Sequence, residues 1–128
     1  MALVLADTST WIDALSGKRA AIVSKMQLLL TEDRIATCGP VLFEIKRGLR
    51  PAERKKVLPL LDALIRLPFE ENIWEKAGDL DASLRGKGIT IPPMDVLIAA
   101  LCLRHDVFLF TLDNHFHSVP GLKLLPMD

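Results

Sequence analysis

Two short apolar runs, each followed closely by an acidic residue, constrain this fold more than any other feature. Leu3–Ala6 is followed directly by Asp7, and Val107–Thr111 is followed by Leu112 and then Asp113. Such runs are typical of strands buried within a sheet. A carboxylate at the end of a buried strand is costly unless it is bound or hydrogen-bonded, so Asp7 is a candidate functional residue. Asp113 has a simpler explanation open to it, because Asp-Asn sequences favour turns.

Helical patterns alternate with short strands along the whole chain. Strands are expected at residues 3–6, 34–38, 67–69, 107–111 and 122–125, and helices at 9–17, 21–30, 39–49, 51–65, 71–85 and 94–104. Ser9 or Thr10 could cap the first helix, and Pro59 inside the fourth indicates a kink or a later start. Short buried strands that alternate with helices predict an α/β fold, with a parallel sheet covered by helices on both faces.

Length and composition limit the chain to one core. Folding of 128 residues can bury about two thirds of the extended surface, enough for one domain and too little for two. Equal numbers of basic and acidic residues exclude a polybasic nucleic-acid-binding tail. The longest apolar run, Val96–Leu103, is far shorter than the ~20 residues of a membrane-spanning helix. The start lacks a basic signal-peptide region, and Cys38 and Cys102 form no C-x-x-C motif, so we expect a cytoplasmic protein without membrane contacts.

Four carboxylates are expected to converge on one edge of this sheet. Asp7 and Asp113 follow strands, and ligands of open α/β sheets bind at the carboxyl ends of strands. Glu44 and Asp95 lie shortly after prolines that open helices pointing at the same edge. Such a cluster needs protons or a cation, and hard oxygen ligands suit Mg²⁺ or Mn²⁺. A divalent ion there suits attack of water on a phosphodiester.

Competing explanations remain open for these acids. Glu44 and Asp95 could simply complement helix dipoles. Phosphatases of the haloacid-dehalogenase type also place an aspartate after their first strand, but they need a second one two residues later, where this chain has Ser9. A receiver-like phospho-acceptor domain would need a lysine after the last main strand, and residues 112–116 contain none.

Four segments in order resemble the motifs of PIN-domain ribonucleases, specifically VapC-type toxins of toxin–antitoxin systems. The matching segments cover almost the whole chain: Asp7–Asp13 (DTSTWID), Pro40–Gly48 (PVLFEIKRG), Leu84–Ala100 (LRGKGITIPPMDVLIAA) and Phe110–Phe116 (FTLDNHF). The resemblance implies a single PIN domain over residues 1–128, built as a three-layer α/β/α sandwich with a short, mostly parallel central sheet. It also implies a Mg²⁺-dependent endoribonuclease toxin that cleaves RNA with a metal-activated water, with Mn²⁺ able to substitute.

The resemblance assigns roles to six residues. Asp7, Glu44, Asp95 and Asp113 correspond to the metal-binding acids, and Ser9 and Thr111 match small hydroxyl positions that orient carboxylates or water. Asp7 and Asp95 are our first choice as ligands, because they should lie deepest between strand end and helix start. Glu44 and Asp113 would complete the shell or hold a second ion.

Basic residues beside the predicted acidic site are candidates for RNA binding. They are Lys46, Arg47, Arg50, Arg54, Lys55, Lys56, Arg85 and Lys87. Such a rim would steer phosphates toward the site, although a solvated helix face is an equally good explanation. His115 and His117 are two residues apart, which is not the spacing of a helical zinc pair, so we expect them to face solvent or RNA.

The expected partners are RNA, a second copy and an antitoxin. The resemblance implies that the RNA is single-stranded or looped, for example transfer RNA or another structured RNA. The leucine-rich stripes at 58–65 and 73–84 could form a homodimer face or receive an antitoxin helix. The resemblance adds a VapB-like antitoxin that fills the acidic groove. The alternative function is a non-catalytic RNA- or protein-binding module on the same fold, which would lack affinity for divalent metal and leave RNA intact.

Overall fold

Four parallel strands form the centre of the molecule in a computed structural model that describes residues 2–126. The strands are β1 (Val4–Ala6), β2 (Ile35–Thr37), β3 (Ile65–Arg66) and β4 (Phe108–Phe110), and their order in the sheet is β3-β2-β1-β4. All three neighbouring pairs are parallel. The predicted parallel sheet is therefore confirmed.

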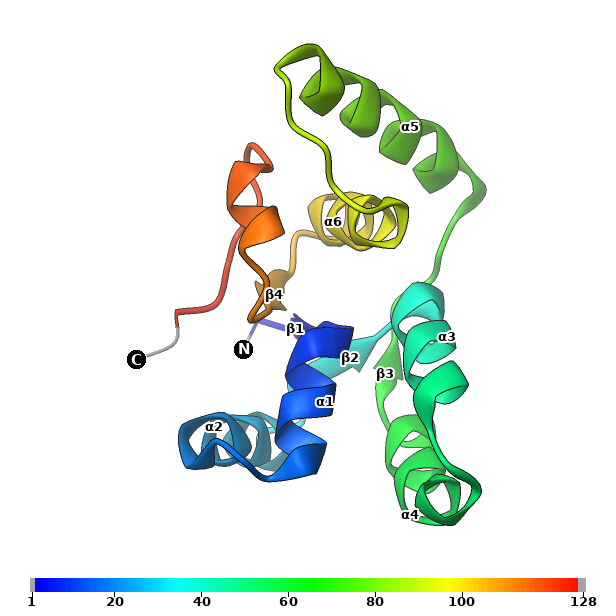
Figure 1. Cartoon of the computed structure of the whole chain (residues 1–128), viewed down its shortest axis with the longest axis vertical. Coiled ribbons are helices and arrows are strands. Elements are labelled where there is room, and N and C mark those ends of the chain that lie inside the picture. The colour runs from blue at the N-terminus through cyan, green and yellow to red at the C-terminus, as the bar shows by residue number, and fades with distance from the viewer. Residues whose placement is uncertain (1, 127–128) are drawn as a thin grey trace.

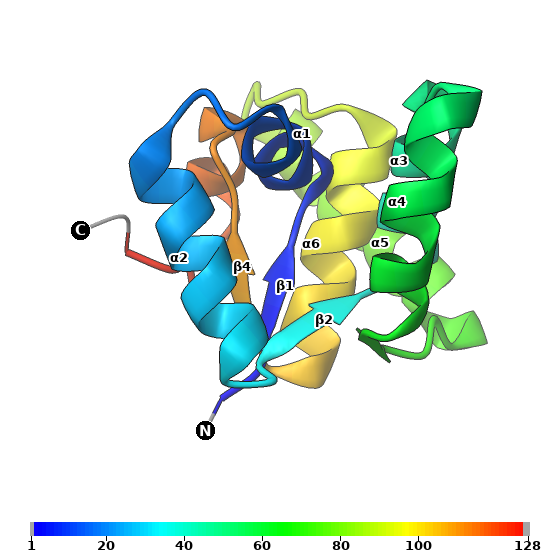
Figure 2. The same cartoon turned by 90° about the horizontal axis from the view of Figure 1, so that it is seen from below.

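Six α-helices surround this sheet, as expected for a three-layer α/β/α sandwich. They are α1 (Thr8–Ser16), α2 (Ala20–Thr31), α3 (Gly39–Gly48), α4 (Pro51–Asp62), α5 (Glu71–Gly86) and α6 (Pro93–His105), followed by the short 3₁₀ helix η1 (Asn114–Ser118). Figure 1 shows α5 and α6 on one side of the sheet and α1 and α2 on the other, with α3 and α4 beside the β2–β3 end. The view from below in Figure 2 shows the same arrangement.

The strand order places a topological switch point between β1 and β4. From β1 the chain steps outward through β2 to β3, and it then returns to add β4 on the other side of β1. The register pairs Ala6 with Phe110, so the next residues, Asp7 and Thr111, leave the sheet side by side. Ligands of open α/β sheets bind in the crevice at this kind of switch point.

The core consists of the sheet and the inward faces of the helices. The residues of β1 and β2 and the last two residues of β4 are almost completely buried, as expected of strands covered on both sides, whereas β3 at the edge is exposed. Helix α6 is strongly apolar because it packs centrally, and Ile98, Ala99 and Leu101 have no exposed surface. The leucine-rich stripes at 58–65 and 73–84, which could have formed a partner face, pack largely against this core. Leu61, Ile73 and Leu84 are each at most 1% exposed.

Some predicted boundaries are wrong. The third strand is Ile65–Arg66 rather than 67–69, and the expected strand at 122–125 is reduced to one bridge between Leu109 and Leu124. Helix α4 begins at Pro51 as expected and continues through Pro59, so a later start is excluded. Neither Ser9 nor Thr10 caps α1; the cap is Asp7, two residues before Ser9.

Two smaller expectations concern membranes and cysteines. None of the helices within residues 2–126 combines the length and the apolar character needed to cross a bilayer. Cys38 and Cys102 are buried and unpaired, and burial raises the pKa of the Cys38 thiol to about 11. They are therefore packed as small hydrophobic groups rather than as reactive thiolates.

Candidate metal centre

A cavity of about 490 Å³ lies at the carboxyl ends of β1 and β4 and contains all four predicted acids. Asp7 and Asp113 come from the strand ends, Asp95 from the first turn of α6 and Glu44 from the middle of α3. The other lining residues are Thr8, Ser9, Ile12, Pro92, Pro93, Met94 and His115. Four segments that are distant along the chain therefore meet in one hollow.

Asp7 is held rigidly by donors from both strand ends. Its side chain caps α1 by accepting the backbone N–H of Thr10 at 3.1 Å, and the same oxygen accepts the Ser9 hydroxyl at 2.7 Å. The Thr111 hydroxyl donates to the second oxygen, because the register of β1 and β4 brings the two residues together. These bonds offset the cost of desolvating a carboxylate that is only 3% exposed.

Asp95, Asp113 and His115 form the tightest group of metal-ligand atoms within residues 2–126. One ligand atom from each residue lies within 4.8 Å of the others. The His115 Nδ1 atom is 2.9 Å from Asp113 Oδ1 and 3.2 Å from Asp95 Oδ2. Asp113 also caps the 3₁₀ helix η1 by accepting the backbone N–H of His115 at 3.1 Å. The cap thus fixes the histidine next to both carboxylates.

The electrostatics of Asp95 indicate a site with a shortage of positive charge. Burial raises the pKa of the Asp95 carboxyl above its ordinary value, and the hydrogen bond from His115 opposes this shift. The negative charges of Asp113, Asp7 and Glu44 raise the pKa further. A divalent cation bound among these groups would remove the repulsion.

Glu44 lines the cavity but lies outside the group formed by Asp95, Asp113 and His115. The Thr8 hydroxyl donates to Glu44 Oε1 at 2.8 Å, which holds α3 to the start of α1. Glu44 and Ile12 also line a second cavity of about 290 Å³ between α1 and α3. The acidic cavity therefore continues into a groove along α1.

The donor set fits a hard divalent ion. Carboxylate oxygens are the ligands that Mg²⁺ and Mn²⁺ prefer, and the cavity leaves room for waters and a phosphate. The closest ligand atoms nevertheless differ from our first choice, the pair Asp7 and Asp95, because the tight group joins Asp95 to Asp113 and His115. Sequence reasoning missed His115, since it compared this residue only with His117 and not with Asp95, which is twenty positions earlier.

The predicted basic residues lie outside the cavity, whose lining contains no lysine or arginine. Lys46 and Arg47 lie in the last turn of α3. Arg50 is the N-cap of α4, and Arg54, Lys55 and Lys56 lie in the first half of that helix. Arg54 donates to the Lys46 carbonyl at 3.1 Å, which joins the two helices. Arg85 pairs with Asp81 at 3.0 Å at the end of α5, and Lys87 follows that helix. These basic residues therefore form a surface outside the acidic cavity and do not line it.

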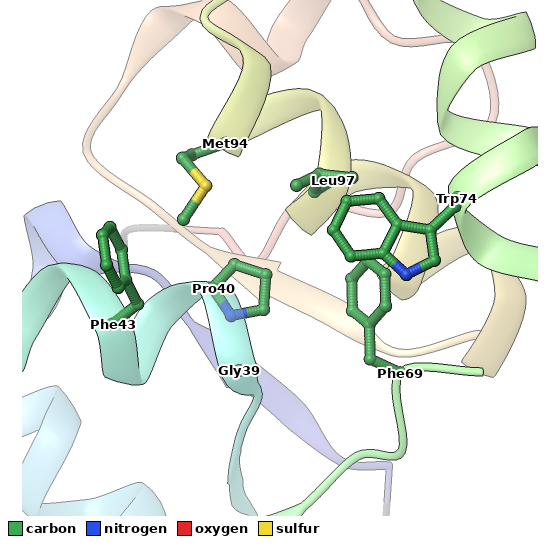
Figure 3. Close-up of a pocket in the computed structure, with 7 residues that line it drawn as sticks. All are labelled: Gly39, Pro40, Phe43, Phe69, Trp74, Met94 and Leu97. Carbon is green, nitrogen blue, oxygen red and sulfur yellow. The ribbon is translucent and has the colours of Figure 1, made fainter. Parts of the chain in front are cut away.

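An apolar pocket of about 320 Å³ adjoins the acidic cavity and shares Met94 with it. Figure 3 shows this pocket between α3, α6 and the start of α5, with Phe43 and Trp74 on opposite sides. Both side chains are more than half exposed, and Trp74 packs on Phe69 with 5.1 Å between ring centroids. None of the seven residues that line the pocket is charged.

Comparison with known proteins identifies the family. The PIN domain model matches residues 4–122. The chain is 31% identical to Ribonuclease VapC19 of Mycobacterium tuberculosis over 120 residues, which cover 93% of this chain and 96% of that protein. It is 29% identical to VapC ribonuclease Mb1587 of Mycobacterium bovis, with 96% of each chain covered.

Solved structures agree on the fold. The VapBC2 complex of Rickettsia felis bound to promoter DNA contains a chain that superimposes with a TM-score of 0.82 at 24% identity, covering 96% of this chain and 97% of that one. The DNA-bound VapBC complex of Salmonella typhimurium gives the same TM-score at 22% identity, with both chains fully covered. With the matching motifs and the switch-point site, these likenesses establish that the chain belongs to the PIN-domain family, in its VapC group.

Proposed function

We propose that this protein is a Mg²⁺-dependent endoribonuclease and the toxin of a toxin–antitoxin pair, in the cytoplasm. The observation that carries the proposal is the meeting of Asp7, Glu44, Asp95 and Asp113 in one open cavity at the switch point. The relatives are named as ribonucleases, which supports RNA as the substrate. Mn²⁺ would substitute for Mg²⁺, because both accept carboxylate ligands.

The chain's own residues would hold and orient the reacting groups. Asp95 and Asp113 would bind the cation directly, while Ser9 and Thr111 keep the Asp7 carboxylate in a fixed orientation beside it. Thr8 performs the same task for Glu44. When bound, the cation supplies Lewis acidity, which polarises a phosphodiester and lowers the pKa of a nearby water. A donor set that is already oriented avoids reorganisation during the reaction.

RNA would reach the cavity across the basic surface of α3 and α4. Lys46, Arg50, Lys55 and Lys56 are exposed on adjacent helices, one of which carries Glu44. Phosphates attracted to this surface would be guided to the acidic site, where only a cation can neutralise the repulsion between phosphate and carboxylates. Arg85 and Lys87 would contribute from the end of α5.

An antitoxin of the VapB type would occupy the groove between α1 and α3. Ile12 is 60% exposed and Leu15 is 43% exposed on this groove, while Glu44 and Glu53 add negative charge. An apolar segment with a basic side chain would satisfy both features and could reach the acidic cavity. Structures similar to this chain are VapBC complexes, which supports such a partner.

A second copy would use the pocket of Figure 3. In a twofold dimer the same patch meets itself, so an uncharged surface avoids repulsion between like charges. The pocket has no charged lining residue, whereas the groove along α1 has two glutamates. Phe43 and Trp74 would be the anchors of this homodimer.

Cleavage of a labelled single-stranded or looped RNA by the purified protein tests the proposal. We expect EDTA to stop cleavage and Mg²⁺ or Mn²⁺ to restore it. Asp95→Asn should reduce cleavage at least about a hundredfold. Asp79→Asn is the matched control, because this acid is exposed on α5 and lies outside the cavity.

Two results would contradict the proposal. Cleavage that survives exhaustive chelation would rule out the metal-dependent reaction. RNA that is bound but left intact by the metal-loaded wild type would favour the non-catalytic binding module instead.

A further inference from the structure

We infer that His115 is a metal ligand of this site and binds the cation through Nδ1, together with Asp95 and Asp113. The inference rests on the proposed function and deepens it, because it changes the donor set from oxygen alone to oxygen plus nitrogen. It also assigns a role to a histidine that its sequence neighbours leave unexplained.

The distances around Nδ1 are those of neighbouring ligands on one ion. Nδ1 is 2.9 Å from Asp113 Oδ1 and 3.2 Å from Asp95 Oδ2. Ligands about 2.1 Å from an octahedral Mg²⁺ ion at right angles to each other are separated by about 3.0 Å. Nδ1 is thus spaced from each of the two carboxylate oxygens as neighbouring ligands of one ion are, and all three atoms lie within 4.8 Å of one another.

The ring of His115 presents Nδ1 to both carboxylates. A neutral imidazole has one ring nitrogen with a hydrogen and one with a lone pair. In the tautomer that has its hydrogen on Nε2, the lone pair of Nδ1 would point at an ion bound to Asp95 and Asp113. Nε2 has no hydrogen-bond partner within residues 2–126, so no contact in that part of the chain opposes this tautomer.

The position of the ring is fixed by the fold. Asp113 caps the 3₁₀ helix η1 through the backbone N–H of His115, so the ligand carboxylate and the imidazole belong to one short turn. Asp95 enters from the first turn of α6. The His115 side chain is 46% exposed, so part of it remains accessible to solvent.

A nitrogen ligand has a consequence for metal choice. Imidazole suits transition metals better than Mg²⁺, whereas carboxylates accept both. A site of two carboxylates and one imidazole therefore favours Mn²⁺ over Mg²⁺ more strongly than the four acids would alone. Removal of the imidazole should reduce affinity for Mn²⁺ more than affinity for Mg²⁺.

Pulsed EPR on the intact, RNA-free protein loaded with Mn²⁺ tests the inference directly. We expect a ¹⁴N coupling from a directly bound imidazole, and this coupling should change to that of ¹⁵N when histidine alone is labelled. The measurement on the wild type needs no variant and so does not depend on a mutant's folding. In a Mn²⁺ titration, His115→Ala should lose about tenfold or more in affinity and a smaller factor for Mg²⁺.

His117→Ala is the matched control, because this histidine lies on the same turn and is exposed outside the cavity. It should keep both the nitrogen coupling and the Mn²⁺ affinity. A Mn²⁺-loaded wild type without histidine coupling would overturn the inference, and cleavage restored by Mg²⁺ after EDTA would show that the proposed function survives. Failure of the wild type to bind any Mn²⁺ or Mg²⁺ would overturn both.

Discussion

The two halves of the acidic cavity are built in opposite ways. In the Asp7 half, the carboxylate is surrounded by donors, since Ser9, Thr10 and Thr111 all donate to it. In the Asp95–Asp113 half, two carboxylates from different elements share one histidine nitrogen. The first half is satisfied by the protein alone, whereas the second is short of positive charge.

This difference indicates that the Asp95–Asp113 half, rather than the Asp7 half, is the part of the cavity that needs a bound cation. Buried carboxylates that accept several hydrogen bonds are part of the fold, and removing them leaves donors unpaired. Carboxylates that lie close together repel each other unless a cation is bound between them. Burial and the neighbouring negative charges accordingly raise the pKa of Asp95. The same residue type therefore stabilises the protein on one side of the cavity and destabilises it on the other.

The largest expected effect is stabilisation by metal. A ligand that binds only the folded state at a hundred times its Kd adds about 2.7 kcal/mol. We expect Mn²⁺ to give this increase in the wild type and none in Asp113→Asn, as measured by thermal or urea unfolding. Asp79→Asn should respond like the wild type. An equal response in Asp113→Asn would place the ion outside the Asp95–Asp113 half.

The next effect is a loss of stability in the Asp7 half. Asp7→Asn replaces one accepting oxygen by an amide NH₂ that faces donors, so buried groups lose their partners. We expect the free energy of unfolding without metal to fall by about 2 kcal/mol. Urea unfolding in EDTA measures it. No change in stability would mean that these hydrogen bonds do not hold the strand ends together.

A smaller effect of opposite sign is expected at Asp95. Its pKa is raised in the folded state, so the native protein binds a proton more strongly than the unfolded chain. Stability without metal should therefore rise as the pH falls through this raised pKa, and at neutral pH the charge costs stability. Asp95→Asn should stabilise the ion-free protein by about 1 kcal/mol and flatten this pH dependence. A destabilised Asp95→Asn protein would contradict the contrast between the halves.

The smallest effect concerns the surface that extends the Asp7 half toward RNA. The Thr8–Glu44 bond connects this half to α3, and α4 packs beside α3 through Arg54. Replacement of Lys55 and Lys56 by alanine should weaken RNA binding and reduce its salt slope by about 0.7 for each lost phosphate contact. Fluorescence anisotropy at several salt concentrations measures this. An unchanged slope would identify α4 as an ordinary solvated face.

Local patterns were sufficient to predict the sheet and its acids. Buried strands at the start of the chain and near residue 109 were predicted because uninterrupted apolar residues have few other places to lie. The carboxylates that follow them were recognised because a charge next to a buried strand needs a partner. The short β3 was misplaced by two residues, because Ile65 was assigned to the apolar face of the preceding helix, which in the structure ends at Asp62.

Caps were less predictable than strands. Ser9 has the right chemistry to cap α1, but Asp7 performs that role because its backbone leaves β1 at the turn before the helix. Ser9 instead donates to Asp7 and accepts the backbone N–H of Leu112, a contact between segments a hundred residues apart. Side chains with similar capping propensity are distinguished only by where the backbone places them.

The sequence by itself determined a parallel α/β fold and four candidate carboxylates, because apolar runs and the acidic residues beside them can be recognised within short segments. Only the tertiary structure decided which of those carboxylates face a histidine and which face hydroxyl groups. Asp95 and His115 meet because α6 and η1 are packed on the same end of β4. The contact between the Asp95 carboxylate and the His115 ring depends on how these elements pack across the sheet, and no local pattern in the chain encodes it.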